Sequence, residues 1–89
     1  MNEILKQVKK QIEEISGGLY YCFPFPSRRT PYLDIYDKST VGWEWICRVE
    51  PLRETDEYHI ISYDSCRSLK KVGKDILLME VLKELWRHE

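Results

Sequence analysis

A helical repeat of apolar residues lies near the N-terminus of the chain. Between residues 3 and 16 the apolar side chains recur three and four positions apart, which places them on one stripe of a helix. The members of this stripe are Ile4, Leu5, Val8, Ile12 and Ile15. Gly17 and Gly18 follow it, and glycine readily adopts the left-handed conformation that ends helices. The pattern predicts an amphipathic helix that buries one face.

The middle of the chain alternates with the period of two that is typical of strands. Three segments have this pattern, at residues 32–37, 41–49 and 58–63. Residues 19–25 are aromatic and extended, but prolines interrupt them and follow them, which favours an edge strand or a polyproline-like loop. In the strongest strand the alternation assigns Trp43 and Trp45 to its apolar face, so we expect both tryptophans in the core.

A second amphipathic helix is predicted at the C-terminal end. Polar residues at 64–68 offer caps for a helix that extends to about His88. Its apolar stripe is Leu77, Leu78, Val81, Leu82 and Leu85, and its solvated face is Glu80, Lys83, Glu84 and Arg87. Apolar residues further upstream are out of phase with this stripe. The helix therefore begins either near Asp75, after a break at Gly73, or earlier with its first turns buried differently.

These elements predict an α+β fold. The order is helix, three or four antiparallel strands, helix, which forms a two-layer sandwich with both helices on one face of the sheet. Strands with one apolar and one polar face are typical of an antiparallel sheet covered on one side only. A length of 89 residues suits one domain spanning residues 1–89.

Composition narrows the class of protein. The chain is 43% hydrophobic and 33% charged with a formal net charge of −1, which is a globular profile and excludes a polybasic tail. It has no secretory signal and no apolar run near the ~20 residues of a membrane helix, so we expect no membrane partner. Cys22, Cys47 and Cys66 show no CxxC spacing, which favours reduced thiols and a cytoplasmic location.

No constellation of residues in the sequence indicates catalysis. Asp34, Asp37 and Glu44 fall on neighbouring predicted strands, and paired carboxylates can hold a metal for phosphodiester cleavage. Ile46, however, stands where a restriction-type nuclease site has its lysine, and the chain has no glycine-rich phosphate loop. We therefore expect a non-enzymatic protein without catalytic residues, metal ion or cofactor.

Basic residues gather at the expected start of the last helix. Amine charges beside the unpaired N–H groups of a helix terminus form an anion site that suits phosphate oxygens. The predicted nucleic-acid contacts are Lys70, Lys71, Lys74, Arg67, Arg28 and Arg29. The alternative is a solvated helix terminus with no ligand.

The lysine run resembles the C-terminal signature of the double-stranded RNA-binding domain family. In that family a Ser-Lys-Lys-x-Ala-Lys run opens the last helix, and Gly73 stands here in place of the alanine. The resemblance covers residues 32–85 and implies helix–three strands–helix topology with Lys70, Lys71 and Lys74 on the phosphates of an RNA duplex. The apolar positions of the family's helix correspond to Leu77, Val81, Leu82 and Leu85. The chain departs from the pattern in its extra segment at residues 19–30.

Aromatic residues support an alternative function. Tyr32 and Tyr36 project from the face opposite the predicted core, where exposed tyrosines indicate a protein interface or a stacking platform for single-stranded bases. Trp86 widens the apolar arc of the last helix, which favours a partner groove or a homodimer. The alternative is thus a small interaction or inhibitor protein, of the kind that viruses and phages encode, with Tyr32, Tyr36 and Trp86 contacting a protein partner.

Overall fold

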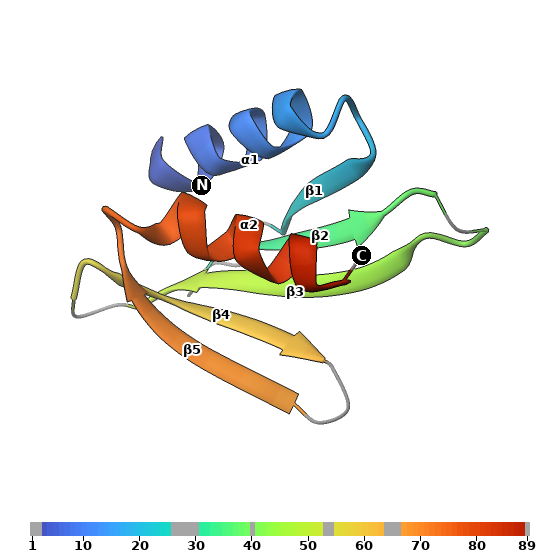
Figure 1. Cartoon of the computed structure of the whole chain (residues 1–89). Helices are drawn as coiled ribbons and strands as arrows, with labels where there is room; N and C mark the ends of the chain where they lie inside the picture. The colour runs from blue at the N-terminus through green and yellow to red at the C-terminus, as the bar shows by residue number, and fades with distance from the viewer. Residues whose placement is uncertain (1–2, 26–30, 40, 53–54, 64–66, 89) are drawn as a thin grey trace.

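The computed structural model describes residues 3–25, 31–39, 41–52, 55–63 and 67–88 (Figure 1). The elements in chain order are α1 (Glu3–Ile15), β1 (Tyr20–Phe25), β2 (Tyr32–Asp37), β3 (Glu44–Pro51), β4 (Glu57–Tyr63), β5 (Arg67–Gly73) and α2 (Leu77–His88). The predicted α+β class, with two helices packed on an antiparallel sheet, is confirmed. The sheet has five strands, because residues 20–25 and 67–73 both join it.

Each strand pairs antiparallel with its neighbour in sequence, so the spatial order is β1-β2-β3-β4-β5. β1 and β5 are therefore the two edges of the sheet. The position of β1 agrees with the edge-strand interpretation of residues 19–25, because a strand that contains Pro24 is tolerated at an edge.

Both helices lie over the same face of the sheet (Figure 1). α1 contacts β1 and β2, α2 contacts β3, β4 and β5, and the two helices contact each other. The core between the layers receives buried side chains from all seven elements, among them Leu5 of α1, Ile35 of β2, Ile60 of β4 and Leu85 of α2. In the part of the chain that the structure describes, no helix covers the opposite face of the sheet, which we call the helix-free side.

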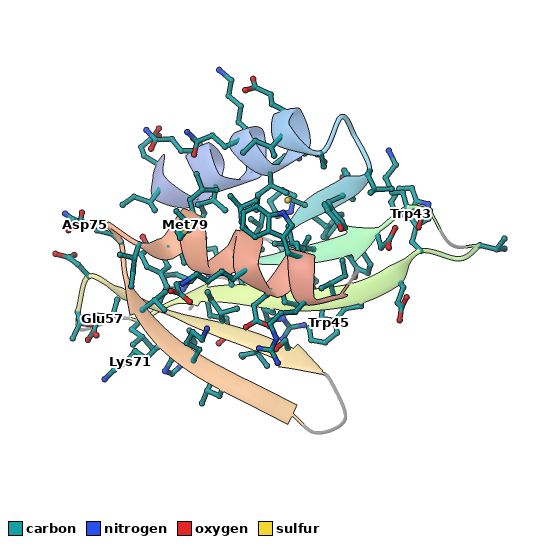
Figure 2. The ribbon with its side chains drawn as sticks, viewed as in Figure 1. Trp43, Trp45, Glu57, Lys71, Asp75 and Met79 are labelled. Carbon is teal, nitrogen blue, oxygen red and sulfur yellow. The ribbon has the colours of Figure 1, made fainter. Side chains whose placement is uncertain are left out.

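A bulge in β3 reverses the expected orientation of the tryptophans. Ile35 pairs with Cys47 and Tyr36 pairs with Trp45, so Ile46 is an extra residue between the two pairs. Ile46 and Cys47 both enter the core, while Trp45 lies on the helix-free side of the sheet (Figure 2). The prediction that Trp43 and Trp45 belong to the core is wrong, because it assumed an unbroken alternation.

The segment predicted to open the last helix is strand β5. Its residues alternate across the sheet: Lys70 and Val72 pair with Ile60 and Tyr58, whose side chains face the helices, and Lys71 pairs with His59 on the other side. A turn closed by the bond from Ile76 N–H to the carbonyl of Gly73 then leads into α2 at Leu77. The helix therefore begins after the break at Gly73, close to the predicted start near Asp75.

One carboxylate assigned to the solvated helix face is buried. Glu84 of α2 points toward the sheet, where its Oε2 accepts a hydrogen bond from the Ser62 hydroxyl at 3.2 Å. Its Oε1 lies 3.4 Å from Arg87 and 3.7 Å from Lys70. Glu84 was expected to be exposed because the helical period alone does not show that β4 and β5 present polar partners to this position.

Candidate interaction face

Aromatic side chains form a continuous chain of contacts on the helix-free side of β1 and β2. We call Tyr21, Phe23, Phe25, Tyr32 and Trp43 the aromatic face. Successive ring centroids are 5.3 Å apart for Trp43–Tyr21, 6.4 Å for Tyr21–Phe23, 6.5 Å for Phe23–Phe25 and 4.8 Å for Phe25–Tyr32. These separations lie in the range of attractive ring pairs. The alternation of β1 places Tyr21, Phe23 and Phe25 on this side and Tyr20 and Cys22 in the core.

Three rings of the aromatic face remain open to solvent. Phe23 is 41% exposed, Phe25 is 44% exposed and Trp43 is 47% exposed. Trp43 lies at the end of the sheet where β2 turns into β3 (Figure 2). Its backbone is in the left-handed region with φ of 49°, directly after Gly42 with φ of 87°, and a bulky residue rarely adopts this conformation. The turn therefore holds the Trp43 ring against Tyr21 at a cost in backbone strain.

Cations lie over three of these rings. The Arg48 guanidinium is 4.0 Å from the centre of the Tyr32 ring, and the amines of Lys9 and Lys38 are 5.0 and 5.6 Å from the centres of Tyr21 and Trp43. All three distances fall within the range of cation–π attraction. Because Phe25 stacks on Tyr32 with an angle of 2° between the ring planes, Tyr32 is held between an aromatic ring and a guanidinium.

A buried carboxylate anchors the polar side of this arrangement. Asp34 of β2 accepts a hydrogen bond from Arg48 Nε at 2.8 Å and another from Trp45 Nε1 at 3.1 Å. Only 8% of the Asp34 side chain is exposed, so the carboxylate is shielded from water, whereas the Arg48 side chain is 34% exposed. The hydrogen bond to Asp34 raises the pKa of Arg48, and the guanidinium also lies 3.7 Å from Glu50. Asp34 thus fixes two side chains of the helix-free face.

The predicted partner-binding residues do not gather on one surface. Tyr32 and Tyr36 share the helix-free side of β2, where burial, followed by the charge of Asp34, raises the pKa of Tyr36. Trp86 instead lies on α2, 57% exposed, in the other layer of the molecule. It borders a pocket of about 200 Å³ between the helices, with Ile15 and Leu19 among the lining residues.

The predicted nucleic-acid contacts are also divided. Lys70 faces α2 and its amine lies 2.9 Å from Glu80, which raises the pKa of Lys70. Lys71 lies on the opposite side of β5, 3.9 Å from Glu57 (Figure 2), and Lys74 is exposed in the following turn. The side chain of Arg67, as well as all of Arg28 and Arg29, lies outside the described residues. The expected lysine cluster at a helix terminus is therefore wrong in its geometry.

The remaining candidate groups are the cysteine thiols and possible metal ligands. Burial raises the pKa of the Cys22 thiol to about 12 and raises the pKa of Cys47 as well, so both remain protonated at neutral pH. Within residues 3–25, 31–39, 41–52, 55–63 and 67–88, no three His, Cys, Asp or Glu side chains come together as a metal site would require. In the same part of the chain, no helix has the length and apolar character to cross a membrane.

Comparison of the chain with protein-family models, with curated proteins and with solved structures finds no match.

The sequence pattern identified one member of the aromatic face, Tyr32, and missed its most exposed rings. Phe23 and Phe25 alternate with Cys22 and Pro24, which is a period-two signal, but the prolines left the choice between strand and loop open. The position of Trp43 against Tyr21 depends on the turn before β3, and no pattern in the neighbouring sequence indicates it. Asp34 could be assigned to the outer side of β2, whereas its contact with Trp45 depends on the bulge.

Proposed function

We propose that this chain is a non-enzymatic protein-binding module and that the aromatic face docks a partner protein. The observation that supports the proposal is the chain of ring contacts on the helix-free side of the sheet, which includes three rings that are 41–47% exposed. Aromatic residues and arginine are enriched in protein interfaces, and Arg48 lies at one end of this ring chain.

The size of the patch supports a protein ligand. Phe23, Phe25 and Trp43 together leave roughly 200–330 Å² of surface open, since an aromatic side chain buries about 150–250 Å² when fully covered. A standard interface buries about 800 Å² on each partner, of which the apolar centre is a fraction. The aromatic face is therefore large enough for the centre of such an interface, with Lys38 and Glu50 near its rim.

Ring geometry and charge favour a protein over single-stranded nucleic acid. Neighbouring rings along β1 are tilted by 52–57°, so they present edges and ridges where stacked bases need flat ring faces. Tyr32 has both ring faces covered, by Phe25 and Arg48. The Arg48 guanidinium is bound to Asp34 and lies beside Glu50, so it is poorly placed to bind a phosphate.

Photo-crosslinking in extracts of the source cells tests the proposal. Phe23 is replaced by p-benzoylphenylalanine, and Lys10, which is exposed on α1, is replaced in a matched control. We expect a discrete protein adduct from position 23 that is absent from position 10 and is lost in a Phe25→Ser background. Adducts of equal yield from both positions, or adducts removed by nuclease and not by protease, would contradict a protein-docking face.

Binding of an RNA duplex through Lys70, Lys71 and Lys74 stays a prediction. Filter binding at two salt concentrations tests it, because contacts to phosphates weaken steeply as salt rises. If this function holds, Lys71→Glu weakens binding and Phe23→Ser leaves it unchanged. If the aromatic face docks a protein instead, Lys71→Glu leaves the adduct from position 23 unchanged, whereas Phe25→Ser abolishes it.

A further inference from the structure

The outer edge of β1 is obstructed at Tyr20, Cys22 and Pro24. The Tyr20 N–H donates to Ser16 Oγ at 3.2 Å, and Lys9 Nζ donates to the carbonyl of Cys22 at 3.0 Å. Pro24, two residues further along the same edge, has no N–H. A strand added at this edge would have to displace Ser16 and Lys9 and would still meet no donor at Pro24. This edge is therefore protected against further strand pairing.

The direction of the backbone groups on β5 follows from the ladder. Leu52 N–H bonds to the carbonyl of Glu57, which makes these two a hydrogen-bonded pair between β3 and β4. Hydrogen-bonded and non-hydrogen-bonded pairs alternate in antiparallel sheets, so the even-numbered residues of β4 bond to β5. Their partners on β5 are Ser68, Lys70 and Val72. The N–H and C=O groups of Leu69 and Lys71 consequently point away from β4, toward the outer edge of the sheet.

This outward edge of β5 is open. Among the described residues, β5 pairs with β4 alone and no backbone group of Leu69 or Lys71 has a partner on the outer side. The side chains of Leu69 and Lys71 are 59% and 57% exposed. Figure 1 shows β5 at the border of the sheet, and α2 contacts β5 from the helix side, where Lys70 meets Glu80. An extended chain can reach these groups without moving a helix.

The charges along β5 select the kind of chain that could be added. Arg67, Lys70, Lys71 and Lys74 are the charged residues of positions 67–74, and none of these positions is acidic. Like charges opposite one another destabilise strand pairs and opposite charges stabilise them. A second copy of β5 would bring these basic residues together, which disfavours self-pairing. An extended segment that carries alternating acidic side chains is favoured instead.

We propose that β5 accepts an extended acidic peptide segment as a sixth strand, bonded through the outward backbone groups of Leu69 and Lys71, with Lys71 and Lys74 facing its carboxylates. Main-chain hydrogen bonds supply affinity in this mode of recognition, and the alternating side chains supply specificity. The site is separate from the aromatic face, so this proposal and the proposed function stand or fall independently.

Amide hydrogen exchange of the intact chain with a synthetic peptide tests the proposal. The probe is a blocked octapeptide of alternating valine and glutamate, and its counterpart has lysine in place of glutamate. We expect the acidic peptide to slow exchange at the Leu69 and Lys71 amides by about tenfold or more. Exchange at Lys70 and Val72, which already bond to β4, changes little. The basic peptide produces no protection.

Two variants separate backbone pairing from simple charge attraction. Leu69→Pro removes one outward N–H and leaves the bonds to β4, so binding is lost, whereas the matched Leu69→Ala variant retains it. Reversal of charge in Lys71→Glu/Lys74→Glu weakens the acidic peptide by about tenfold and favours the basic one. The exchange measurement on the wild-type chain decides the question even if Leu69→Pro fails to fold.

Three results would overturn the proposal. They are absence of binding at about 1 mM acidic peptide, equal binding of the basic peptide, and binding without protection of the Leu69 and Lys71 amides. If the peptide instead perturbs the resonances of Phe23 and Phe25, the edge proposal fails and the aromatic face gains a ligand. Crosslinking from position 23 that persists while β5 binds nothing leaves the proposed function intact.

Discussion

Asp34 is the residue that organises the helix-free face of the sheet. Its carboxylate receives Arg48 and Trp45 from β3, so it connects β2 to the strand that contains the bulge. Arg48 in turn lies over Tyr32, which stacks on Phe25 of β1. One buried charge is therefore linked through two contacts to the aromatic face.

Removal of the Asp34 charge is expected to destabilise the chain. In Asp34→Asn the ion pair with Arg48 is lost, and we expect the free energy of unfolding to fall by about 1–3 kcal/mol. The expected loss of stability is smaller than that for a fully buried ion pair, because Arg48 is 34% exposed and can be hydrated. Urea unfolding followed by circular dichroism measures the change.

Glu50→Gln is the matched control for Asp34→Asn. Glu50 lies 3.7 Å from the same guanidinium but is more exposed than Asp34, so its replacement changes stability by less than about 0.5 kcal/mol. Equal losses in the two variants would show that Asp34 has no special role.

At the scale of elements, Lys70 connects β5 to α2. Its amine lies 2.9 Å from Glu80 and 3.7 Å from Glu84, and both glutamates lie on one face of α2. The hydrogen bond from Lys70, followed by that from Lys83, lowers the pKa of Glu80 below its ordinary value of 4.5. The same contact raises the pKa of Lys70 above its ordinary value of 10.5. The strand edge and the helix are thus joined by charge as well as by apolar packing.

Lys70→Gln is expected to destabilise the chain at neutral pH in a pH-dependent manner. Because the pKa of Glu80 is lowered, its contribution is present above pH 4.5 and is lost as pH falls through the lowered pKa. Because the pKa of Lys70 is raised, its contribution is present below pH 10.5 and is lost as pH rises through the raised pKa. The urea midpoint of the variant therefore falls below that of the wild type between these limits.

The midpoints of variant and wild type should converge at acidic pH. Lys83→Gln serves as control, since Lys83 also contacts Glu80 at 3.3 Å but lies on the same helix and, among the described residues, forms no ion pair with a second element. Its effect on the midpoint is smaller than that of Lys70→Gln. A difference for Lys70→Gln that does not depend on pH would assign its effect to packing instead of charge.

At the scale of the whole molecule, one core joins all the elements. Each helix and each strand contributes at least one buried apolar side chain, including Val72 from the edge strand β5. Neither helix has a separate core of its own, because α1 and α2 pack on the same face of one sheet. Loss of any element would expose part of the core shared by the others.

We expect the chain to unfold in a single cooperative transition. Urea curves from far-ultraviolet circular dichroism and from tryptophan fluorescence should coincide, because Trp43, Trp45 and Trp86 report on both layers that the shared core connects. Midpoints that differ between the two probes would show that one layer unfolds independently.

Local sequence patterns predicted much of the fold and little of the site. The stripes of α1 and α2 and the alternation of β2 and β4 were recognised because each depends on the period of its own element. β5 was missed because the basic residues at 67–74 suggested a helix terminus, although Lys70 and Lys71 of this strand lie on opposite sides of the sheet. Trp45 was assigned to the wrong side because one extra residue, Ile46, inverts the alternation.

The sequence by itself determined the α+β class and the amphipathic helices, and it confined the proline-containing segment to an edge strand or a loop, since these depend on the spacing and backbone chemistry of neighbouring residues. Only the tertiary structure decided that Lys70 and Lys71 face opposite sides, that Asp34 receives Arg48 and Trp45, and that Trp43 completes the aromatic face. These features join residues on different elements, so they depend on strand register, a bulge and a left-handed turn. Register and the bulge are set by pairing between strands, which the period within a single strand does not determine.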